Sequence, residues 1–423
     1  MLDITHVRRE PKAVLENLEK RQDKKAVEDF KTLLEKDESW RKLKARADSL
    51  RKSRNEMTEQ VKKVKQEGRD ITPLLESAKS LPKEIQKLDD EVEKVRAEVD
   101  MLLMRTPNLL HDTVPFGKSA EDNQVVRTFG EPSKPNFELK HHGQLAQDLD
   151  LADFERAVKI SGAGFYFLKG ELALMDHALM NLGLSILLEK GFTPVIPPFM
   201  MRRTPYEGVT DLSDFEDVMY KIEGEDEYMI ATSEHPIAAM HMGEILEENQ
   251  LPLKYAGISQ CFRKEIGKHG LDERGLFRVH QFSKIEQFVF AKPDDSWNII
   301  EDLIKNAEEL MQKLEIPYRI VNVCTGDIGT VAAKKYDLEG WSPREEKFIE
   351  LASCSNCTSY QAVRLGIKYR HGNDKDYVHT LNSTMIATAR VLRLILENYQ
   401  TEDGGLKIPK ALTKQLCCDY IGR

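Results

Sequence analysis

Cysteine is scarce in this chain of 423 residues, and its placement argues against a disulfide-stabilised fold. Six cysteines occur, and none precedes Cys261. A disulfide framework needs closely spaced cysteines in a short chain. Cys354 and Cys357 have the spacing of half a zinc site, but the adjacent Cys417 and Cys418 do not supply a second spaced pair. We therefore expect buried thiols at these positions rather than a zinc site.

Long apolar runs are also lacking. The first residues, MLDITHVRREPKAV, contain no apolar core of signal-peptide length. No run approaches the roughly 18–20 apolar residues that cross a membrane as a helix. The sequence therefore predicts a soluble, cytoplasmic protein without a membrane partner.

Basic residues do not dominate the overall charge. The net charge is −9, charged residues make up 31% of the chain and hydrophobic residues 40%. An acidic molecule is not a generic binder of polyanions, so any contact with nucleic acid has to come from a local basic patch. The high charged content is typical of a long solvated helical region, and the length predicts two or three domains.

Glycine is almost absent between residues 26 and 104, where the apolar residues form two helical ladders. One ladder contains Trp40, Leu43, Ala47, Leu50, Met57, Val61 and Val64, and the other contains Ile85, Leu88, Val92, Val95, Val99 and Leu102. Steps of three and four alternate as in a coiled coil, except where Arg54 occupies one position. Residues 67–73, EGRDITP, have the composition of a turn. We predict an antiparallel coiled-coil hairpin, preceded by a short helix that Asp3 or Thr5 caps, in a domain spanning residues 1–110.

The first of these helices is strongly basic between Trp40 and Gln66. Ten basic residues and three acidic residues lie there; the basic ones are Arg41, Lys42, Lys44, Arg46, Arg51, Lys52, Arg54, Lys62, Lys63 and Lys65. Such a run is either an ordinary solvated face or an arm that binds phosphates. Because aromatic residues are not interleaved beyond Trp40, recognition of the backbone and shape of structured RNA fits better than base stacking.

Proline and glycine return after residue 105. Pro107, Pro115, Pro132 and Pro135 fall in this stretch, together with Gly117 and Gly130. We interpret residues 111–136 as a linker that contains one short strand-like segment, and residues 137–423 as a second domain.

A charged, glycine-rich segment between two strand-like runs is the most informative part of the chain. It extends from Ile258 to Phe290 and reads ISQCFRKEIGKHGLDERGLFRVHQFSKIEQFVF. Alternating apolar residues predict an antiparallel pair of strands. Arg263 and Arg278 lie at the ends of these runs, near Glu265 and Glu286. Two arginines beside two carboxylates suit an anionic ligand that also carries a cationic group, such as a nucleotide next to an amino acid.

Further segments carry residues of the same kind. Thr232-Ser233-Glu234 lies where a strand meets a helix, which also suits a simple helix cap. FIELASCSN spans residues 348–356, and TLNSTMIATAR spans residues 380–390 ahead of an amphipathic helix. A long helix ending near Lys190 is followed by the extended segment FTPVIPP.

These segments together resemble the three motifs of the class II aminoacyl-tRNA synthetases, and RGLFRVHQFSKIE resembles the seryl branch of that class. The resemblance covers nearly the whole chain and implies an α+β fold. The implied catalytic domain follows the helical hairpin in the sequence and is built on a mixed, mainly antiparallel β-sheet flanked by helices. The helix before Gly191 and the prolines after it resemble the motif that builds a homodimer interface in this class.

The resemblance assigns ATP as a substrate and implies a set of ATP-binding residues. Arg263 would hold the α-phosphate, Glu265 would orient ATP, Arg278 would face the distal phosphates and Phe282 would stack on adenine. Arg390 would contact the triphosphate, so that Arg263 and Arg390 are the implied catalytic residues. The full implied set is Arg263, Lys264, Glu265, Arg278, Val279, Phe282, Glu350, Leu351, Ala352, Ser353 and Arg390.

Magnesium, serine and tRNA are the other ligands that the resemblance implies. Glu350 and Ser353 offer the oxygen ligands that Mg²⁺ prefers. The implied serine-binding residues are Thr232, Ser233, Glu234, Glu286 and Thr384, and the implied tRNA-binding residues are Arg41, Lys44, Arg51, Arg54, Lys62 and Lys65. Ser383 and Ala389 stand where the family often has glycine, which puts the fine geometry near Arg390 in question.

The implied reaction is the activation of L-serine by ATP and its transfer to the 3′ end of tRNA(Ser), with tRNA(Sec) as a further acceptor. One alternative is a related ligase that loads a carrier protein, for which a basic helical arm has no use. The other is an inactive RNA-binding paralogue, against which the presence of all motif arginines and carboxylates argues.

Overall fold

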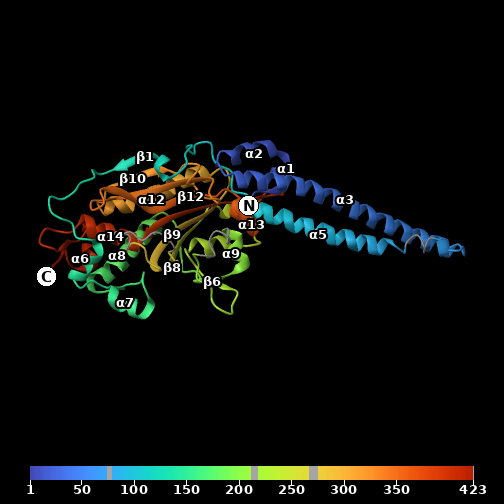
Figure 1. The fold of residues 1–423 in the computed structure, drawn as a ribbon. Helices are drawn as coiled ribbons and strands as arrows, with labels where there is room; N and C mark the ends of the chain where they lie inside the picture. Colours follow the sequence, from blue (N-terminus) through green and yellow to red (C-terminus); the bar gives the residue numbers. More distant parts are fainter. Residues whose placement is uncertain (74–78, 211–217, 266–274, 423) are drawn as a thin grey trace. The chain divides into compact units, whose positions relative to one another are not determined.

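The computed structural model describes residues 1–73, 79–210, 218–265 and 275–422 (Figure 1). The chain divides into two compact units, Met1–Pro107 and Asn108–Arg423. Each unit buries its own set of apolar side chains.

The first unit is entirely helical in its described part. Asp3 caps the first helix by accepting a hydrogen bond from the Thr5 N–H at 2.8 Å, as the sequence predicted. Asp23 caps the long helix through the N–H groups of Lys25 and Ala26. Such side chains satisfy backbone donors that have no partner within the helix. The helices are α1 (Ile4–Arg9), α2 (Pro11–Glu19), α3 (Lys24–Gln66) and α5 (Leu81–Arg105).

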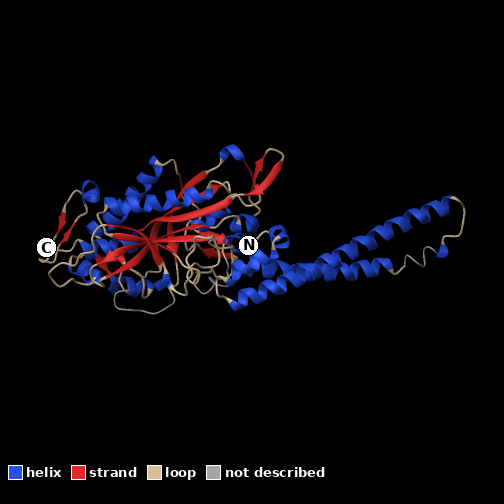
Figure 2. Cartoon of the chain, turned by 90° about the horizontal axis from the view of Figure 1, so that it is seen from above, coloured by secondary structure: helices blue, strands red, loops and turns tan. Residues whose placement is uncertain are grey.

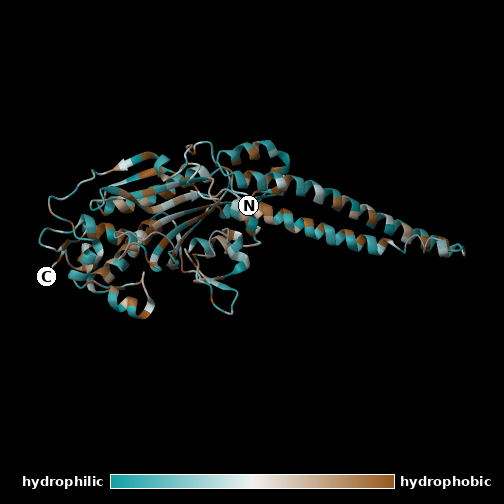
Figure 3. Cartoon of the chain, in the orientation of Figure 1, coloured by the Kyte–Doolittle hydropathy of each residue, from teal (hydrophilic) through white to brown (hydrophobic). Residues whose placement is uncertain are grey.

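α3 and α5 form the predicted helical hairpin and run side by side (Figures 1 and 2). The ladder residues Ala47, Ile85, Leu88, Val99 and Leu102 are all at most 7% exposed. The rest of α3 is mostly hydrophilic (Figure 3). Since one stripe on each helix is apolar, each helix buries the stripe of the other, which explains why the sequence needs both ladders.

An eight-stranded sheet organises the second unit (Figure 2). All neighbouring strands pair antiparallel except β4 and β8, which are parallel. The predicted mixed, mainly antiparallel sheet is confirmed. In spatial order the strands are β1 (Gln124–Phe129), β10 (Tyr318–Asn322), β11 (Lys334–Ser342), β12 (Lys347–Asn356), β15 (His379–Ala387), β9 (Gln281–Ala291), β8 (Leu253–Phe262) and β4 (Thr193–Val195).

Three long helices pack on this sheet: α8 (Gly170–Glu189), α12 (Ser296–Lys313) and α14 (Thr388–Asn398). Residues such as Ile300, Leu303 and Ile304 of α12 recur at helical spacing and are at most 1% exposed. The shorter helices are α6 (His142–Asp148), α7 (Phe154–Ser161), α9 (Arg203–Val209), α11 (Glu234–Ala239), α13 (Tyr360–Leu365) and α15 (Lys410–Leu416).

Small sheets surround the large one. They pair β2 (Ala152–Asp153) with β3 (Phe167–Leu168), β5 (Met200–Arg202) with β6 (Glu227–Met229), β13 (Lys368–His371) with both β7 (Ile245–Glu247) and β14 (Asp374–Tyr377), and β16 (Leu406–Lys407) with β17 (Tyr420–Ile421).

The segment interpreted as a linker, residues 111–136, contributes a strand to the large sheet. β1 pairs antiparallel with β10, and the rings of Phe129 and Tyr318 stack with their centroids 5.3 Å apart. The division between the two units falls at Pro107, before this segment. Pro115 and Pro132 lie outside β1, so the strand keeps all of its backbone donors.

α8 departs from the expectation that no segment approaches a membrane span. Among the described residues it is the one helix long and apolar enough to cross a membrane by length and composition. Leu172, Met175, Leu179 and Leu187 nevertheless pack into the core of the second unit. Its apolar composition is therefore in part that of a core helix.

Candidate active site

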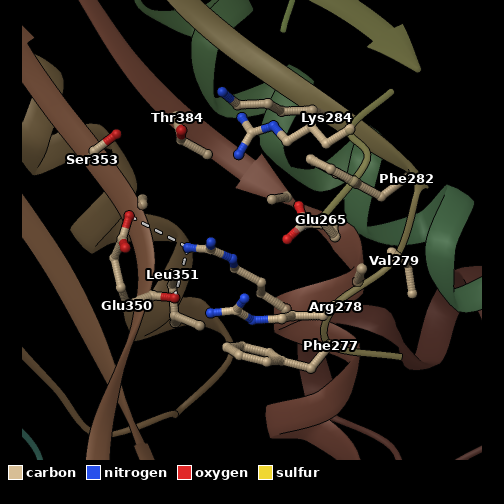
Figure 4. Close-up of a pocket in the computed structure, with 15 residues that line it drawn as sticks. Glu265, Phe277, Arg278, Val279, Phe282, Lys284, Glu350, Leu351, Ser353 and Thr384 are labelled. Atoms are coloured by element: carbon tan, nitrogen blue, oxygen red, sulfur yellow. Dashed lines mark hydrogen bonds and ion pairs between the residues drawn. The ribbon is translucent and has the colours of Figure 1, made fainter. Parts of the chain in front are cut away.

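A cavity of about 290 Å³ opens beside the central strands of the second unit (Figure 4). Its walls come from the segment after β8, the turn before β9 and the start of β9, the middle of β12, the end of β15 and the first turn of α14. The lining residues are Arg263, Glu265, Phe277, Arg278, Val279, Phe282, Lys284, Glu350, Leu351, Ala352, Ser353, Thr384, Ala387, Ala389 and Arg390. Segments more than a hundred residues apart in sequence thus meet at one site.

Strand alternation and two bulges direct side chains into this cavity. On β9, Phe282, Lys284 and Glu286 share one face because side chains alternate along a strand. Between β11 and β12 the register shifts at Leu351, and between β15 and β9 it shifts at Met385. Such bulges place an extra residue in one strand and re-aim its neighbours.

The bulge at Leu351 explains how Glu350 and Ser353 both reach the cavity. Residues three apart in a regular strand point to opposite faces. The register pairs Leu338 with Ala352 and then Glu339 with Glu350, which leaves Leu351 without a partner. Glu350 and Ser353 consequently line the same cavity, one oxygen donor from each (Figure 4).

Three arginines give the cavity its positive charge. Arg390, in the first turn of α14, donates from Nη1 to the Glu350 carbonyl oxygen at 3.0 Å. Arg263 donates from Nε to the Ala231 carbonyl oxygen at 3.2 Å, and its guanidinium lies 5.4 Å from the centre of the Phe282 ring. Arg278 extends into the same space (Figure 4). Arginines beside a half-buried aromatic ring suit a ligand with both phosphates and a flat base.

Glu350 is held as a carboxylate. Burial opposes its ionisation, but Arg390, Lys335 and Arg263 together outweigh burial and lower its pKa. Its Oε1 atom lies 3.4 Å from Arg390 Nη1. An ionised carboxylate in a basic cavity is an available ligand for a cation.

A buried polar layer lies beside Thr384 and Lys284 at the inner end of the cavity. Lys284 forms an ion pair with Glu286 and donates to Thr232 Oγ1 at 3.1 Å. Thr384, which faces Glu286 across β15 and β9, donates to its Oε2 atom at 3.4 Å. Glu286 is 1% exposed, and burial raises its pKa. This layer presents donors and acceptors in a fixed arrangement.

Glu234 extends the polar layer. Its Oε1 atom accepts hydrogen bonds from Gln361 and Asn382, each at 3.1 Å. Burial, reinforced by the negative charge of Glu286, raises the pKa of Glu234 to about 7. Burial therefore raises the pKa of both Glu234 and Glu286, and Lys284 offsets part of that effect through its ion pair with Glu286.

Most of the predicted ATP-site residues line the cavity, with one exception. Lys264 is not part of its lining, and its backbone N–H donates to the Val218 carbonyl oxygen at 2.8 Å. It follows Arg263 directly, beyond the end of β8 at Phe262.

Among the predicted serine-site residues, Thr384 alone lines the cavity. Glu286 and Thr232 contact Lys284 in the adjoining layer. Ser233 donates from Oγ to the Gly257 carbonyl oxygen at 3.1 Å and is fully buried, which is a packing role.

Phe277 and Lys284 are lining residues that the sequence reasoning missed. Lys284 was overlooked because a lysine in an alternating strand usually faces solvent, yet it is 6% exposed. Its position between Phe282 and Glu286, two residues from each, was the available signal. Phe277 carried no comparable signal, because it lies in a glycine-rich turn.

The two positions that often carry glycine in the family accommodate their present side chains. Ser383 is fully buried opposite Cys354 in the β12–β15 register. Ala389 lines the cavity next to Arg390 with only a methyl group. Small side chains at both positions leave the approach to Arg390 open.

The cysteines of the Cys354-x-x-Cys357 pair lie in the core. Cys354 Sγ donates to the Ile300 carbonyl oxygen at 3.6 Å, and Cys357 Sγ accepts from Asn382 at 3.6 Å. Burial raises the pKa of both thiols. Within the described parts of the chain, no three His, Cys, Asp or Glu side chains are grouped to hold a metal ion.

The six predicted tRNA-binding residues lie on α3 of the first unit. Arg51 spans the hairpin by donating to Asp89 on α5 at 2.6 Å, so it has a structural contact as well. Arg41 pairs with Asp37 at 3.0 Å and Lys62 with Glu59 at 2.7 Å. The Lys44 ammonium lies 5.0 Å from the centre of the Trp40 ring. Arg54 and Lys65 are exposed.

Comparison with known families agrees with this geometry. The tRNA synthetase class II core domain (G, H, P, S and T) matches residues 218–399, and the seryl-tRNA synthetase N-terminal domain matches residues 1–110. The antiparallel sheet with its arginine-lined cavity is thus that of a class II aminoacyl-tRNA synthetase.

Relatives over the full length make the assignment more specific. A serine–tRNA ligase from Methanocorpusculum labreanum is 57% identical over 97% of this chain and 98% of the relative. The crystal structure of seryl-tRNA synthetase from Pyrococcus horikoshii complexed with ATP is 46% identical, with a TM-score of 0.95 over 100% of this chain and 99% of that one. A cytoplasmic serine–tRNA ligase from Naegleria fowleri in complex with AMP is 36% identical, with a TM-score of 0.86 over 97% and 95% of the two chains. The chain belongs to the seryl-tRNA synthetase family.

Proposed function

We propose that this protein activates L-serine with ATP and transfers the seryl group to the 3′ end of tRNA(Ser), with tRNA(Sec) as a further acceptor. In the first step a serine carboxylate oxygen attacks the α-phosphorus, and pyrophosphate leaves with the electrons of the broken P–O bond. In the second step the terminal ribose hydroxyl of tRNA attacks the activated carbonyl carbon, and AMP leaves. No side-chain nucleophile is needed in either step.

The observation that carries this proposal is that a basic cavity adjoins a buried polar layer. The outer cavity holds Arg263, Arg278 and Arg390 with the Phe282 ring, while the inner layer holds Glu286 and other buried polar groups. Phosphates and a base fit the former, and a small zwitterion fits the latter. Catalysis then rests on fixed positive charge and on holding the reactants in line.

Within the outer cavity, the geometry supports a distinct task for each ATP-site residue. Arg263, braced by Ala231, is placed for the α-phosphate, and Arg278 for the distal phosphates. Phe282 offers its ring to adenine, with Val279 beside it. Glu265 has a positive φ of 43°, which turns the chain at the cavity rim and suits its task of orienting ATP.

Magnesium fits the residues that are present. Glu350 supplies an ionised carboxylate and Ser353 a hydroxyl on the same side of β12, and both are hard oxygen donors. A bound Mg²⁺ would neutralise phosphate charge. Leu351 and Ala352 form the wall between these two donors.

Serine selection falls to the inner layer. Glu286 and Glu234 supply negative charge for the serine ammonium group, and Thr384 and Thr232 supply hydroxyls. A pocket built to hydrogen-bond a hydroxyl rejects alanine, because its own buried polar groups would stay unpaired.

The basic face of α3 is the proposed tRNA-binding surface. Arg54, Lys62 and Lys65 are exposed, whereas Arg51 contacts Asp89 across the hairpin. Exposed cations along a helix bind phosphates without reading base sequence.

We further infer a cytoplasmic homodimer. Several large apolar side chains stay exposed near the helix and prolines that resemble the class II dimer motif; they are Phe167, Leu174, Leu188, Ile196 and Met200. Apolar side chains that recur along one region mark a surface for another protein. A second copy of this chain fits that surface.

Serine-dependent exchange of pyrophosphate into ATP tests the proposed function most directly. The purified protein should exchange labelled pyrophosphate into ATP only with serine, and not with alanine or threonine at equal concentration. Exchange that ignores serine and responds to another amino acid would overturn the specificity. Serine-dependent exchange without charging of tRNA would support the activation step and overturn the transfer step.

A further inference from the structure

Arg393 is an unusual residue for the interior of the second unit. It lies on α14 three residues after Arg390, and its side chain is 1% exposed. Its Nε donates to Glu397 Oε1 at 2.7 Å, and its Nη2 pairs with Glu345. A buried charge is costly even when paired, and an apolar residue would often be no less stable there. The position therefore calls for a role besides packing.

The Arg393 guanidinium packs on a residue of the ATP cavity. Its central carbon lies 4.4 Å from the centre of the Phe277 ring, and that of Arg390 lies 5.7 Å from the same ring. A cation this close to an aromatic ring is attracted to it, more strongly where water is excluded. Phe277 immediately precedes Arg278, and both side chains extend into the cavity (Figure 4).

A second anchor holds the same turn from its backbone. The Leu276 N–H donates to His142 Nε2 at 3.4 Å, and His142 Nδ1 lies 3.6 Å from Glu397 Oε1. Gly275 has a φ of +82°, and a Cβ there would come within 3.0 Å of His142 Nε2. The backbone is thus packed against the imidazole, whose Nε2 faces the turn and whose Nδ1 faces Glu397.

Glu397 joins the two anchors. Its carboxylate accepts hydrogen bonds from Arg393 and Ser342 and faces His142, and the residue is 1% exposed. Burial alone would raise its pKa, but His142, Arg393 and Ser342 hold it below its usual value. The carboxylate is therefore a fixed negative centre between the turn and α14.

We propose that Arg393 is a positioning residue for ATP, which acts with Glu397 and His142 to hold residues 275–278 against α14. Arg278 then enters the cavity on a turn fixed by its two preceding residues, and Arg390 is aligned from the other side of the same network. This inference rests on the proposed function, because its readout is serine activation.

The test compares Arg393→Met, Arg393→Lys and Phe277→Leu in serine-dependent pyrophosphate exchange. Arg393→Met should raise the KM for ATP about tenfold, while the KM for serine changes less than about twofold. Arg393→Lys keeps a cation near Phe277 and should recover part of the loss. Phe277→Leu should reproduce the ATP defect, and combining it with Arg393→Met should add little further, because both remove the same interaction.

Arg127→Met is the matched control. Arg127 is also an ion-paired arginine, bound to Glu301 and Glu308 on the β1 side of the sheet. The Arg127→Met variant should have a lower melting temperature and an unchanged KM for ATP.

An unchanged KM for ATP in Arg393→Met, with a lower melting temperature, would overturn the inference and leave a structural role. An equal rise in the KM for ATP and in the KM for serine would overturn the inference as well. If Arg393→Met does not fold, Arg393→Lys and Phe277→Leu decide the question alone. A wild-type protein without serine-dependent exchange would instead refute the proposed function.

Discussion

Charged side chains behave differently in the helical hairpin and around the cavity. On α3, Lys52 and Lys62 are 79% and 64% exposed, and their partners Glu56 and Glu59 lie within one helical turn. Around the cavity, the Lys284 and Glu286 side chains are 7% and 2% exposed; they pair with each other on β9, and their further partners Thr232 and Thr384 come from other segments of the chain. Exposed pairs are weak and are screened by salt, whereas buried charges act strongly and only in one geometry.

This contrast has a functional consequence. A surface of exposed cations binds a polyanion through many small, nearly additive contributions. A cavity of fixed charges stabilises one arrangement of reactants, and single changes there act together with their neighbours. We therefore expect large, non-additive effects in the cavity and smaller, additive, salt-dependent effects on the hairpin.

The largest effect is expected for Arg263→Ala. Loss of one preorganised donor at the α-phosphate should reduce the rate of serine-dependent exchange about 10²–10³-fold, or about 2.7–4 kcal/mol. The measurement is kcat/KM for ATP in the exchange reaction. Arg319→Ala is the control, since Arg319 pairs with Glu339 on the same sheet outside the cavity lining. A near-normal rate for Arg263→Ala would remove it from the catalytic residues.

Neutralising the basic face of α3 should have an intermediate effect. Changing Arg41, Lys44, Arg51, Arg54, Lys62 and Lys65 to Gln should raise the KM for tRNA roughly tenfold to a hundredfold at physiological salt. The dependence of binding on salt should become shallower by roughly 0.9 for each phosphate that the variant no longer neutralises. Pyrophosphate exchange, which needs no tRNA, should stay within about twofold.

Lysines of the return helix provide the control for that experiment. Changing Lys83, Lys87 and Lys94 of α5 to Gln should alter tRNA binding less for each charge removed. Equal effects per charge on both helices would mean that the hairpin binds tRNA through its positive charge in general and not through the basic face of α3. Parallel losses in exchange and in tRNA charging would mean that the α3 residues are structural.

The smallest effect on activity is expected for Glu234→Gln, which also changes stability in a way that depends on pH. Glu234 has a pKa of about 7 in the folded protein against an ordinary value of 4.5. Between these values the folded state retains a proton that the unfolded state has lost, so this residue's contribution to stability falls as pH rises through the window. Glu234→Gln removes this dependence. At pH 8 its free energy of unfolding should exceed that of the wild type by on the order of 1–3 kcal/mol.

Urea unfolding at pH 5 and pH 8 measures the effect of Glu234→Gln on stability. The KM for serine should rise in the same variant, because a neutral amide attracts the ammonium group less than a carboxylate does. An identical pH slope for wild type and variant would show that Glu234 ionises normally. An unchanged KM would remove it from the serine site.

The sequence predicted the framework well because its signals were periodic. The ladders through Ala47 and Val99 anticipated the hairpin, and the alternation around Phe282 anticipated β8 and β9. Arg263, Arg278 and Arg390 converge on one cavity as the resemblance implied. Their roles toward ATP stay predictions.

Other features depend on long-range contacts that no local pattern encodes. The burial of Lys284 follows from strands on both sides of β9, and that of Arg393 from the turn at residues 275–278. The place of residues 124–129 in the sheet depends on β10, almost two hundred residues later. The sequence predicted a short strand-like segment within a connection there, and only the distant pairing partner places that strand in the large sheet.

The unpaired Leu351 determines which side chains of β12 face the cavity. A strict two-residue alternation through this strand would put Glu350 and Ser353 on opposite surfaces, and the extra residue brings them back into phase. Grafting the two oxygen donors onto a regular strand would therefore fail, even with their spacing kept. The smallest portable unit is the segment from Glu350 to Ser353 together with the neighbouring strand that tolerates its offset. Deleting Leu351 would remove the bulge and leave Glu350 and Ser353 two residues apart on a regular strand, still on one face.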